Sequence, residues 1–101
     1  MKSEKTLSPV HPGEILQCDF LEPMNLSQNK LSLEIKVSAR RINEIVLGKR
    51  GITADTALRL SIFFGTTPEL WLNLQNQYEI DTAKLKEEEE LRQIIRPFKA
   101  A

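Results

Sequence analysis

A short run in the middle of the chain combines side chains that can read the edges of DNA bases. It comprises Ala39, Arg40, Arg41, Asn43 and Glu44. Arginine can donate two hydrogen bonds to guanine, asparagine can pair with adenine, and an alanine methyl can touch the methyl group of thymine. Glu44 can accept a hydrogen bond from cytosine, or it can orient a neighbouring arginine. On an ordinary surface helix both arginines would be solvated, so their role depends on the elements that position them.

Polar and basic residues around this run could hold the phosphate backbone. Lys49 and Arg50 follow the run, Ser38 precedes it, and Gln28 lies ten residues before Ser38. A side chain beside a helix N-terminus can join the helix amide groups in holding a phosphate. Outside such a context, Lys49 and Arg50 would form an ordinary basic turn. We expect all four residues to contact phosphate.

Two short helices are predicted to carry these residues. Ser27 and Ser38 are good N-cap residues, and they predict helices from 28 to about 35 and from 39 to about 47. Ser32 supplies a small side chain where the two helices must approach closely. The apolar residues expected to pack between the helices are Leu31, Ile35, Val37, Ile42 and Ile45. This pattern is typical of a helix-turn-helix unit, whose second helix enters the major groove.

The turn between these helices departs from the usual pattern at Lys36. Glycine normally occupies this position because the backbone there tends to a positive φ. A residue with a side chain costs about 1 kcal/mol in that conformation. The turn is therefore predicted to form at some energetic cost.

The rest of the chain has helical punctuation, which predicts an all-α fold class. A first helix is expected from about Pro12 to the residue before Pro23. Thr53 is expected to cap a helix that ends near Phe64, and Thr67 to cap another that begins at Pro68.

The expected organisation is a mobile arm over 1–11, a helix-turn-helix domain over 12–80 and a C-terminal segment over 81–101. That last segment is either a continued helix or a tail that only a partner orders. In the helical alternative, four apolar side chains would point inward: Leu85, Leu91, Ile94 and Ile95.

The formal net charge of zero conceals an uneven distribution. The net charge is −2 over 1–26 and −2 over 60–101, whereas residues 27–59 carry seven basic against three acidic side chains, or +4. A basic segment is the usual electrostatic sign of nucleic-acid binding. The charge pattern therefore favours DNA in the middle of the chain and leaves acidic flanks for another partner.

Other classes of protein are not favoured by the composition. No apolar stretch approaches the ~18–20 residues that a membrane span needs. One Cys and one His give no metal-ligand spacing, and no nucleophile–base grouping or phosphate-binding glycine loop is present. We expect a cytoplasmic domain that is not an enzyme and has no cofactor, metal or membrane partner.

The chain closely resembles the HigA-type antitoxins, also called VapI-like, of the Xre helix-turn-helix superfamily. Four segments carry the resemblance: 11–16 (HPGEIL), 38–46 (SARRINEIV), 48–60 (GKRGITADTALRL) and 64–75 (FGTTPELWLNLQ). The resemblance spans about residues 8–83 and implies a five-helix, lambda-repressor-like fold with an additional C-terminal helical segment. Lys36 differs from the usual glycine of the family.

The resemblance implies a bacterial type II antitoxin that neutralises a small RelE-like (HigB-type) mRNA-cleaving toxin. Members dimerise and repress their own operon at a palindromic operator. Ala39, Arg40, Asn43 and Glu44 match positions where related phage-type repressors touch bases. Trp71 and Leu74 are then expected at the dimer surface, and Tyr78 shares their face, although the residues alone allow a core role. Toxin could bind the acidic first helix, with Glu14, Asp19 and Glu22, or the acidic C-terminal segment.

Two other functions fit the same residues. The chain could be a stand-alone Xre-type transcriptional regulator without a toxin, or a protein-interaction module that has lost DNA binding.

Overall fold

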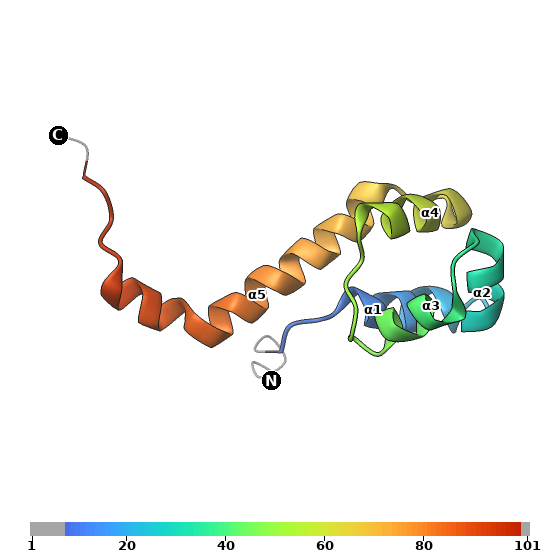
Figure 1. Cartoon of the computed structure of the whole chain (residues 1–101), viewed down its shortest axis with the longest axis horizontal. Coiled ribbons are helices and arrows are strands. Elements are labelled where there is room, and N and C mark those ends of the chain that lie inside the picture. The colour runs from blue at the N-terminus through green and yellow to red at the C-terminus, as the bar shows by residue number, and fades with distance from the viewer. Residues whose placement is uncertain (1–7, 100–101) are drawn as a thin grey trace.

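The computed structural model describes residues 8–99, and that part of the chain contains helices and no strand. The elements in order are α1 (Pro12–Ile15), the π-helix η2 (Leu16–Leu21), α2 (Gln28–Ile35), α3 (Ala39–Val46), α4 (Ala54–Phe64) and α5 (Pro68–Ile94). The elements from α1 to α4 and the start of α5 form a body from which the rest of α5 projects (Figure 1). The predicted all-α fold is confirmed.

Four of the helices begin at the predicted N-cap residues. Ser27, Ser38, Thr53 and Thr67 each use a side-chain oxygen to accept a hydrogen bond from the backbone N–H three residues later. This bond satisfies one of the amide groups that a helix N-terminus leaves without a partner. The local sequence therefore determines where these helices begin.

The first helix begins at Pro12 and ends just before Pro23, as predicted, but its second half is a π-helix. His11 caps α1: its Nδ1 accepts a hydrogen bond from the Gly13 N–H at 2.9 Å, and its imidazole is buried, so it is no part of a free arm. The helix then widens into η2, where the Glu22 N–H donates to the Gln17 carbonyl. Because π-helical bonds join residues five apart, Leu16 and Leu21 both reach the core.

The core lies where the helices of the body meet. Trp71 of α5 has no exposed surface, and its ring lies 5.0 Å from that of Phe20 and 6.4 Å from that of Phe64. Its Nε1 donates to the Thr66 hydroxyl at 2.9 Å, which satisfies the polar atom of the buried indole. The buried apolar residues of this core are Leu16, Leu21, Leu31, Ile35, Ile42, Ile45, Ile52, Ala57, Leu60 and Trp71.

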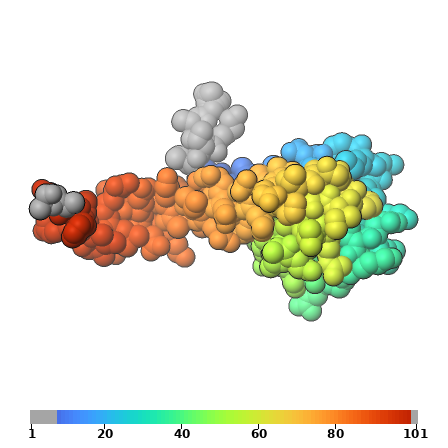
Figure 2. Space-filling view, turned by 90° about the horizontal axis from the view of Figure 1, so that it is seen from above, coloured from blue at the N-terminus to red at the C-terminus, as the bar shows by residue number. Residues whose placement is uncertain are grey.

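The C-terminal segment is a direct continuation of α5 as far as Ile94. This part of the helix extends away from the body, and the molecule measures 55 Å along its longest axis (Figures 1 and 2). The four apolar side chains expected to point inward are exposed instead: Leu85, Leu91, Ile94 and Ile95. That expectation was wrong because, within residues 8–99, no other helix packs along this stretch of α5 (Figure 2).

None of the helices within residues 8–99 is both long and apolar enough to span a membrane. Over the same residues, no group of three or more His, Cys, Asp or Glu side chains is arranged to hold a metal ion.

Candidate nucleic-acid interface

Helices α2 and α3 pack against each other through the residues predicted for a helix-turn-helix unit. Four of the five apolar residues are buried and Val37 is partly buried. Ser32 is also buried, and its hydroxyl donates to the Asn29 carbonyl at 2.7 Å, so no polar atom opposes the close approach of the helices. The predicted unit is present.

The turn of this unit has the backbone conformation expected at its unusual residue. Lys36 has φ 63° and ψ 47°, in the left-handed region. The N–H groups of Lys36 and Val37 both donate to the Ser32 carbonyl, which closes the end of α2. The chain thus forms the turn without glycine.

Arg40 and Asn43 are exposed on α3, as is Ala39. The Arg40 side chain is 83% exposed, and its Nε donates to the Glu44 carboxylate at 2.8 Å. Arg50 donates to the other oxygen of that carboxylate at 2.9 Å. These hydrogen bonds, first from Arg40 and then from Arg50, hold the pKa of Glu44 below its ordinary value. Glu44 therefore orients two arginines, the second of the two roles considered for it.

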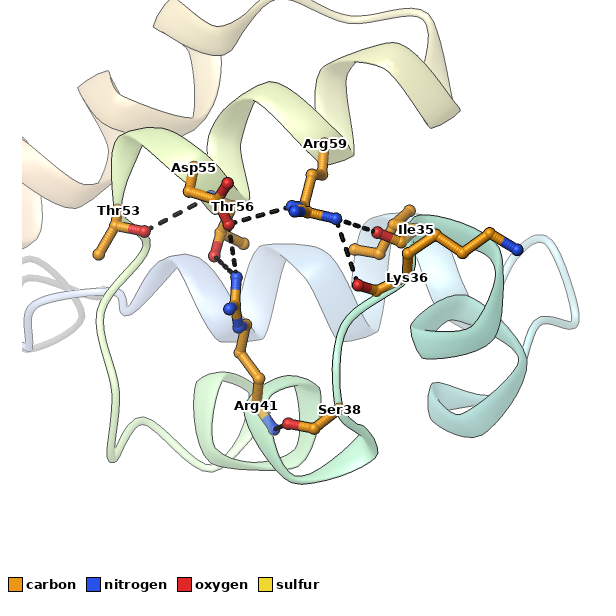
Figure 3. A network of polar contacts seen from close by, with 8 residues as sticks. All are labelled: Ile35, Lys36, Ser38, Arg41, Thr53, Asp55, Thr56 and Arg59. Atoms are coloured by element: carbon orange, nitrogen blue, oxygen red, sulfur yellow. Dashed lines mark hydrogen bonds and ion pairs between the residues drawn. The ribbon is translucent and has the colours of Figure 1, made fainter.

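Arg41, the second arginine of the run predicted to read bases, is only partly exposed. Its side chain is 29% exposed and points to α4, where it donates to Asp55 at 2.7 Å and to the Thr56 hydroxyl at 3.3 Å (Figure 3). The hydrogen bond from Arg41 is the main cause that lowers the pKa of Asp55. Arg41 follows Arg40 directly, yet the helical turn of about 100° per residue directs it to a different neighbour.

The four residues expected to contact phosphate lie around α3. Gln28 accepts a hydrogen bond from the Asn43 side chain at 3.2 Å, which joins the start of α2 to α3. Ser38 is exposed and caps α3 by accepting from the Arg41 N–H. Lys49 and Arg50 are exposed in the turn after α3. Arg50 is joined to Arg40 through the Glu44 carboxylate.

Arg59 contributes to this unit, although the sequence pattern did not identify it. Its Nη1 donates to the carbonyls of Ile35 and Lys36, at 2.7 and 3.2 Å, and its Nε donates to Asp55 at 3.0 Å (Figure 3). The one available signal was its position four residues after Asp55, which allows a pair on one helix face. Its contacts with α2, more than twenty residues away, have no signal in the sequence.

The three residues expected at a dimer surface differ in their exposure. Trp71 is enclosed in the core, so its side chain cannot touch a partner directly. Leu74 and Tyr78 are partly buried, and the Tyr78 ring lies edge-on to His11 at 4.8 Å between centroids. Of these three residues, Leu74 and Tyr78 have exposed side-chain surface and Trp71 has none.

Comparison with known proteins places this arrangement in a family. The helix-turn-helix family matches residues 19–71. Virulence-associated protein I of Dichelobacter nodosus is 52% identical over 75 residues, which are 74% of this chain and 69% of that protein. Antitoxin HigA-1 of Vibrio cholerae is 35% identical over 80% of this chain and 77% of its own length.

A solved structure gives the same assignment. The antitoxin HigA of Pseudomonas aeruginosa, solved with the higBA promoter, superposes with a TM-score of 0.87 and 41% identity, over 90% of this chain and 99% of that one. The likeness includes the helix-turn-helix unit and extends well beyond it, at an identity high enough to indicate common descent. The chain belongs to the helix-turn-helix family and, within it, to the HigA/VapI-type antitoxins.

Proposed function

We propose that this antitoxin binds a palindromic operator in its own promoter as a homodimer and neutralises a RelE-like (HigB-type) mRNA-cleaving toxin. The observation that carries the DNA part is the surface of α3, where Arg40 and Asn43 are exposed and held by Glu44 and Gln28. The similar HigA of Pseudomonas aeruginosa was solved with promoter DNA, which supports the same use here.

On the basis of these contacts, we propose that some residues around α3 read bases and others support them. Ala39, Arg40 and Asn43 are the proposed base readers. Glu44 is proposed either to hold Arg40 toward the bases or to accept a hydrogen bond from a cytosine itself. We assign Arg41 to support, because its guanidinium is engaged by α4. The proposed phosphate contacts are Gln28, Ser38, Lys49 and Arg50.

A dimer is proposed because a palindrome needs two reading helices, about 34–36 Å apart for half-sites one DNA turn apart. The face of α5 that carries Leu74 and Tyr78 is partly open, and exposed apolar residues continue along the same helix as far as Ile94. A dimer that used this face would leave α3 of each subunit free for DNA.

The toxin is proposed to meet an acidic flank, since a basic nuclease would be attracted there. Glu14, Asp19 and Glu22 are exposed along the first helix and the turn after it. The run 87–90 on α5 is the second acidic surface.

Two measurements test the proposal. The full chain should shift a DNA fragment of its own promoter in a mobility assay, and it should co-purify with the small basic protein encoded next to its gene. A shift without co-purification would identify a stand-alone transcriptional regulator. Co-purification without a shift would identify a module that binds protein only, and absence of both would reject the proposed function.

A further inference from the structure

We propose that Arg59 is a positioning residue for DNA reading, which fixes the helix-turn-helix turn from outside and thereby sets the direction of α3. This inference rests on the proposed function, because it assigns a role within the same DNA-reading surface. Arg59 belongs to α4, whereas the proposed readers belong to α3. Its effect on the readers would therefore pass through the backbone of the turn and through Asp55.

The first step of the argument is the pair of carbonyls that Arg59 binds. The last carbonyl groups of a helix lack partners within the helix. At the end of α2, the carbonyls of Ile35 and Lys36 receive the Nη1 of Arg59 at 2.7 and 3.2 Å. A guanidinium donates stronger hydrogen bonds than a neutral group, so these are firm attachments.

The second step is the location of these carbonyls on either side of one strained residue. The peptide plane of the Ile35 carbonyl precedes the Lys36 Cα, and the plane of the Lys36 carbonyl follows it. The orientations of these two planes define φ and ψ of Lys36. One nitrogen of Arg59 therefore restrains both dihedral angles of the residue that occupies the left-handed region without being glycine.

The third step is the connection to the reading helix. Asp55 accepts hydrogen bonds from Arg59 at 3.0 Å and from Arg41 at 2.7 Å, both on its Oδ2 (Figure 3). Arg41 lies in the first turn of α3. A single carboxylate thus joins the side chain that holds the end of α2 to a side chain at the start of α3. The network fixes both helices relative to α4.

Direct contact between Arg59 and a DNA phosphate is the competing explanation, because the Arg59 side chain is 38% exposed. The two roles differ in how they respond to salt. Removing a phosphate contact weakens all DNA alike and lowers the salt slope of binding by about 1. Misdirecting α3 instead lowers the ratio of operator affinity to non-specific affinity, with the salt slope retained.

The binding test uses Arg59→Ala in the full chain, the promoter fragment and a scrambled duplex of equal length, titrated at several salt concentrations. The affinity ratio should fall roughly tenfold, as for the loss of one good base contact, with an unchanged salt slope. Adding Lys36→Gly should restore most of the ratio, because glycine adopts the left-handed conformation without help.

Asn25→Gly is the matched control for this rescue. Asn25 is the other non-glycine residue with positive φ within residues 8–99, with φ 53°, and it lies outside the helix-turn-helix turn. Combined with Arg59→Ala, it relieves backbone strain elsewhere and should leave the ratio low. Equal rescue by both glycines would show that Arg59 supplies stability alone. An equal loss for both DNAs with a reduced salt slope would show a phosphate contact, and either result would overturn the proposal.

A second measurement needs no DNA. Hydrogen exchange of the Val37 amide, which donates to the Ser32 carbonyl at 3.0 Å, should accelerate in Arg59→Ala and slow again when Lys36→Gly is added. Unchanged exchange would overturn the positioning role even if the promoter binds. Conversely, if the natural chain fails to bind its promoter, the proposed function fails while this exchange still tests Arg59. If Arg59→Ala does not fold, Arg59→Lys takes its place in both measurements. This variant keeps the positive charge but loses the planar guanidinium fork.

Discussion

Gly13 of α1 lies so close to the backbone of Ile45 in α3 that a Cβ at this position would overlap the Ile45 carbonyl oxygen. The neighbouring obstacle is backbone, which cannot rotate away as a flexible side chain could. Helix α1 therefore supports α3 by direct backbone contact. Gly13 belongs to HPGEIL (11–16), the first of the segments that resemble the HigA-type antitoxins. The close packing against Ile45 explains why this position holds glycine.

Gly13→Ala is expected to destabilise the fold by about 2 kcal/mol or more, because α1 must move away from α3. Urea unfolding followed by circular dichroism would measure the change. Glu14→Ala is the control on the same helix; Glu14 is exposed, and its loss should cost at most about 1 kcal/mol of dipole interaction. Equal losses of stability from Gly13→Ala and Glu14→Ala would show that the close approach of Gly13 to the Ile45 backbone does not require glycine.

Gln75→Ala is expected to destabilise the chain by about 1–3 kcal/mol, because it leaves the buried backbone N–H of Ile52 without a hydrogen-bond acceptor. The Gln75 side chain is buried, and its Oε1 accepts a hydrogen bond from the Ile52 N–H at 2.8 Å. The bond ties the loop after α3 to α5. Thermal unfolding would show the loss as a lower midpoint.

Gln77→Ala provides the comparison for Gln75. Gln77 lies on the same helix, is exposed, and donates to Asp81 at 2.9 Å. Its removal should change the unfolding free energy by no more than about 0.5 kcal/mol. If Gln75→Ala changed the unfolding free energy as little as Gln77→Ala, the Ile52 N–H would have found another hydrogen-bond acceptor.

The buried His11 cap is expected to make the free energy of unfolding fall in mild acid. Burial lowers the pKa of its imidazole, and Glu14 opposes this shift to a smaller extent. A protonated imidazole cannot accept the hydrogen bond from the Gly13 N–H, so the unfolded chain binds the proton more readily. The contribution of the cap is therefore complete above the unfolded pKa of about 6.5 and is lost as the pH falls below it.

The check is to measure unfolding free energy at about pH 7.5 and about pH 5.5 in the natural chain and in His11→Asn. Asparagine can cap the helix but does not titrate in this range. The natural chain should lose more stability than the variant between the two pH values. Parallel behaviour would exclude His11 as the titrating group.

Arg40 and Lys49 are expected to affect DNA binding in different ways. Arg40→Ala should reduce operator affinity about tenfold or more while non-specific affinity changes little, because a base contact is lost. Lys49→Ala should weaken both kinds of DNA and reduce the salt slope by about 1. Fluorescence anisotropy titrations with the promoter duplex and with a scrambled duplex would distinguish these two effects. Unchanged operator affinity in the combined Arg40→Ala, Arg41→Ala variant would remove α3 from base reading.

The sequence by itself determined where four of the helices begin and where the turn lies, because these features depend on local interactions. Ser27, Ser38, Thr53 and Thr67 cap helices within three residues of themselves, so the N-terminus of each helix can be predicted without knowledge of the fold. The spacing of apolar residues likewise indicated which faces of α2 and α3 meet. Even the left-handed conformation of Lys36 followed from its position in the pattern.

Only the tertiary structure decided the roles of side chains that are alike in sequence. Arg40 and Arg41 are adjacent arginines on one helix, yet one is exposed beside Glu44 and the other binds Asp55 of α4. The link from Arg59 to the carbonyls of Ile35 and Lys36 spans more than twenty residues of chain. Such contacts depend on where a distant helix packs, and charge and spacing within a segment carry no information about that position.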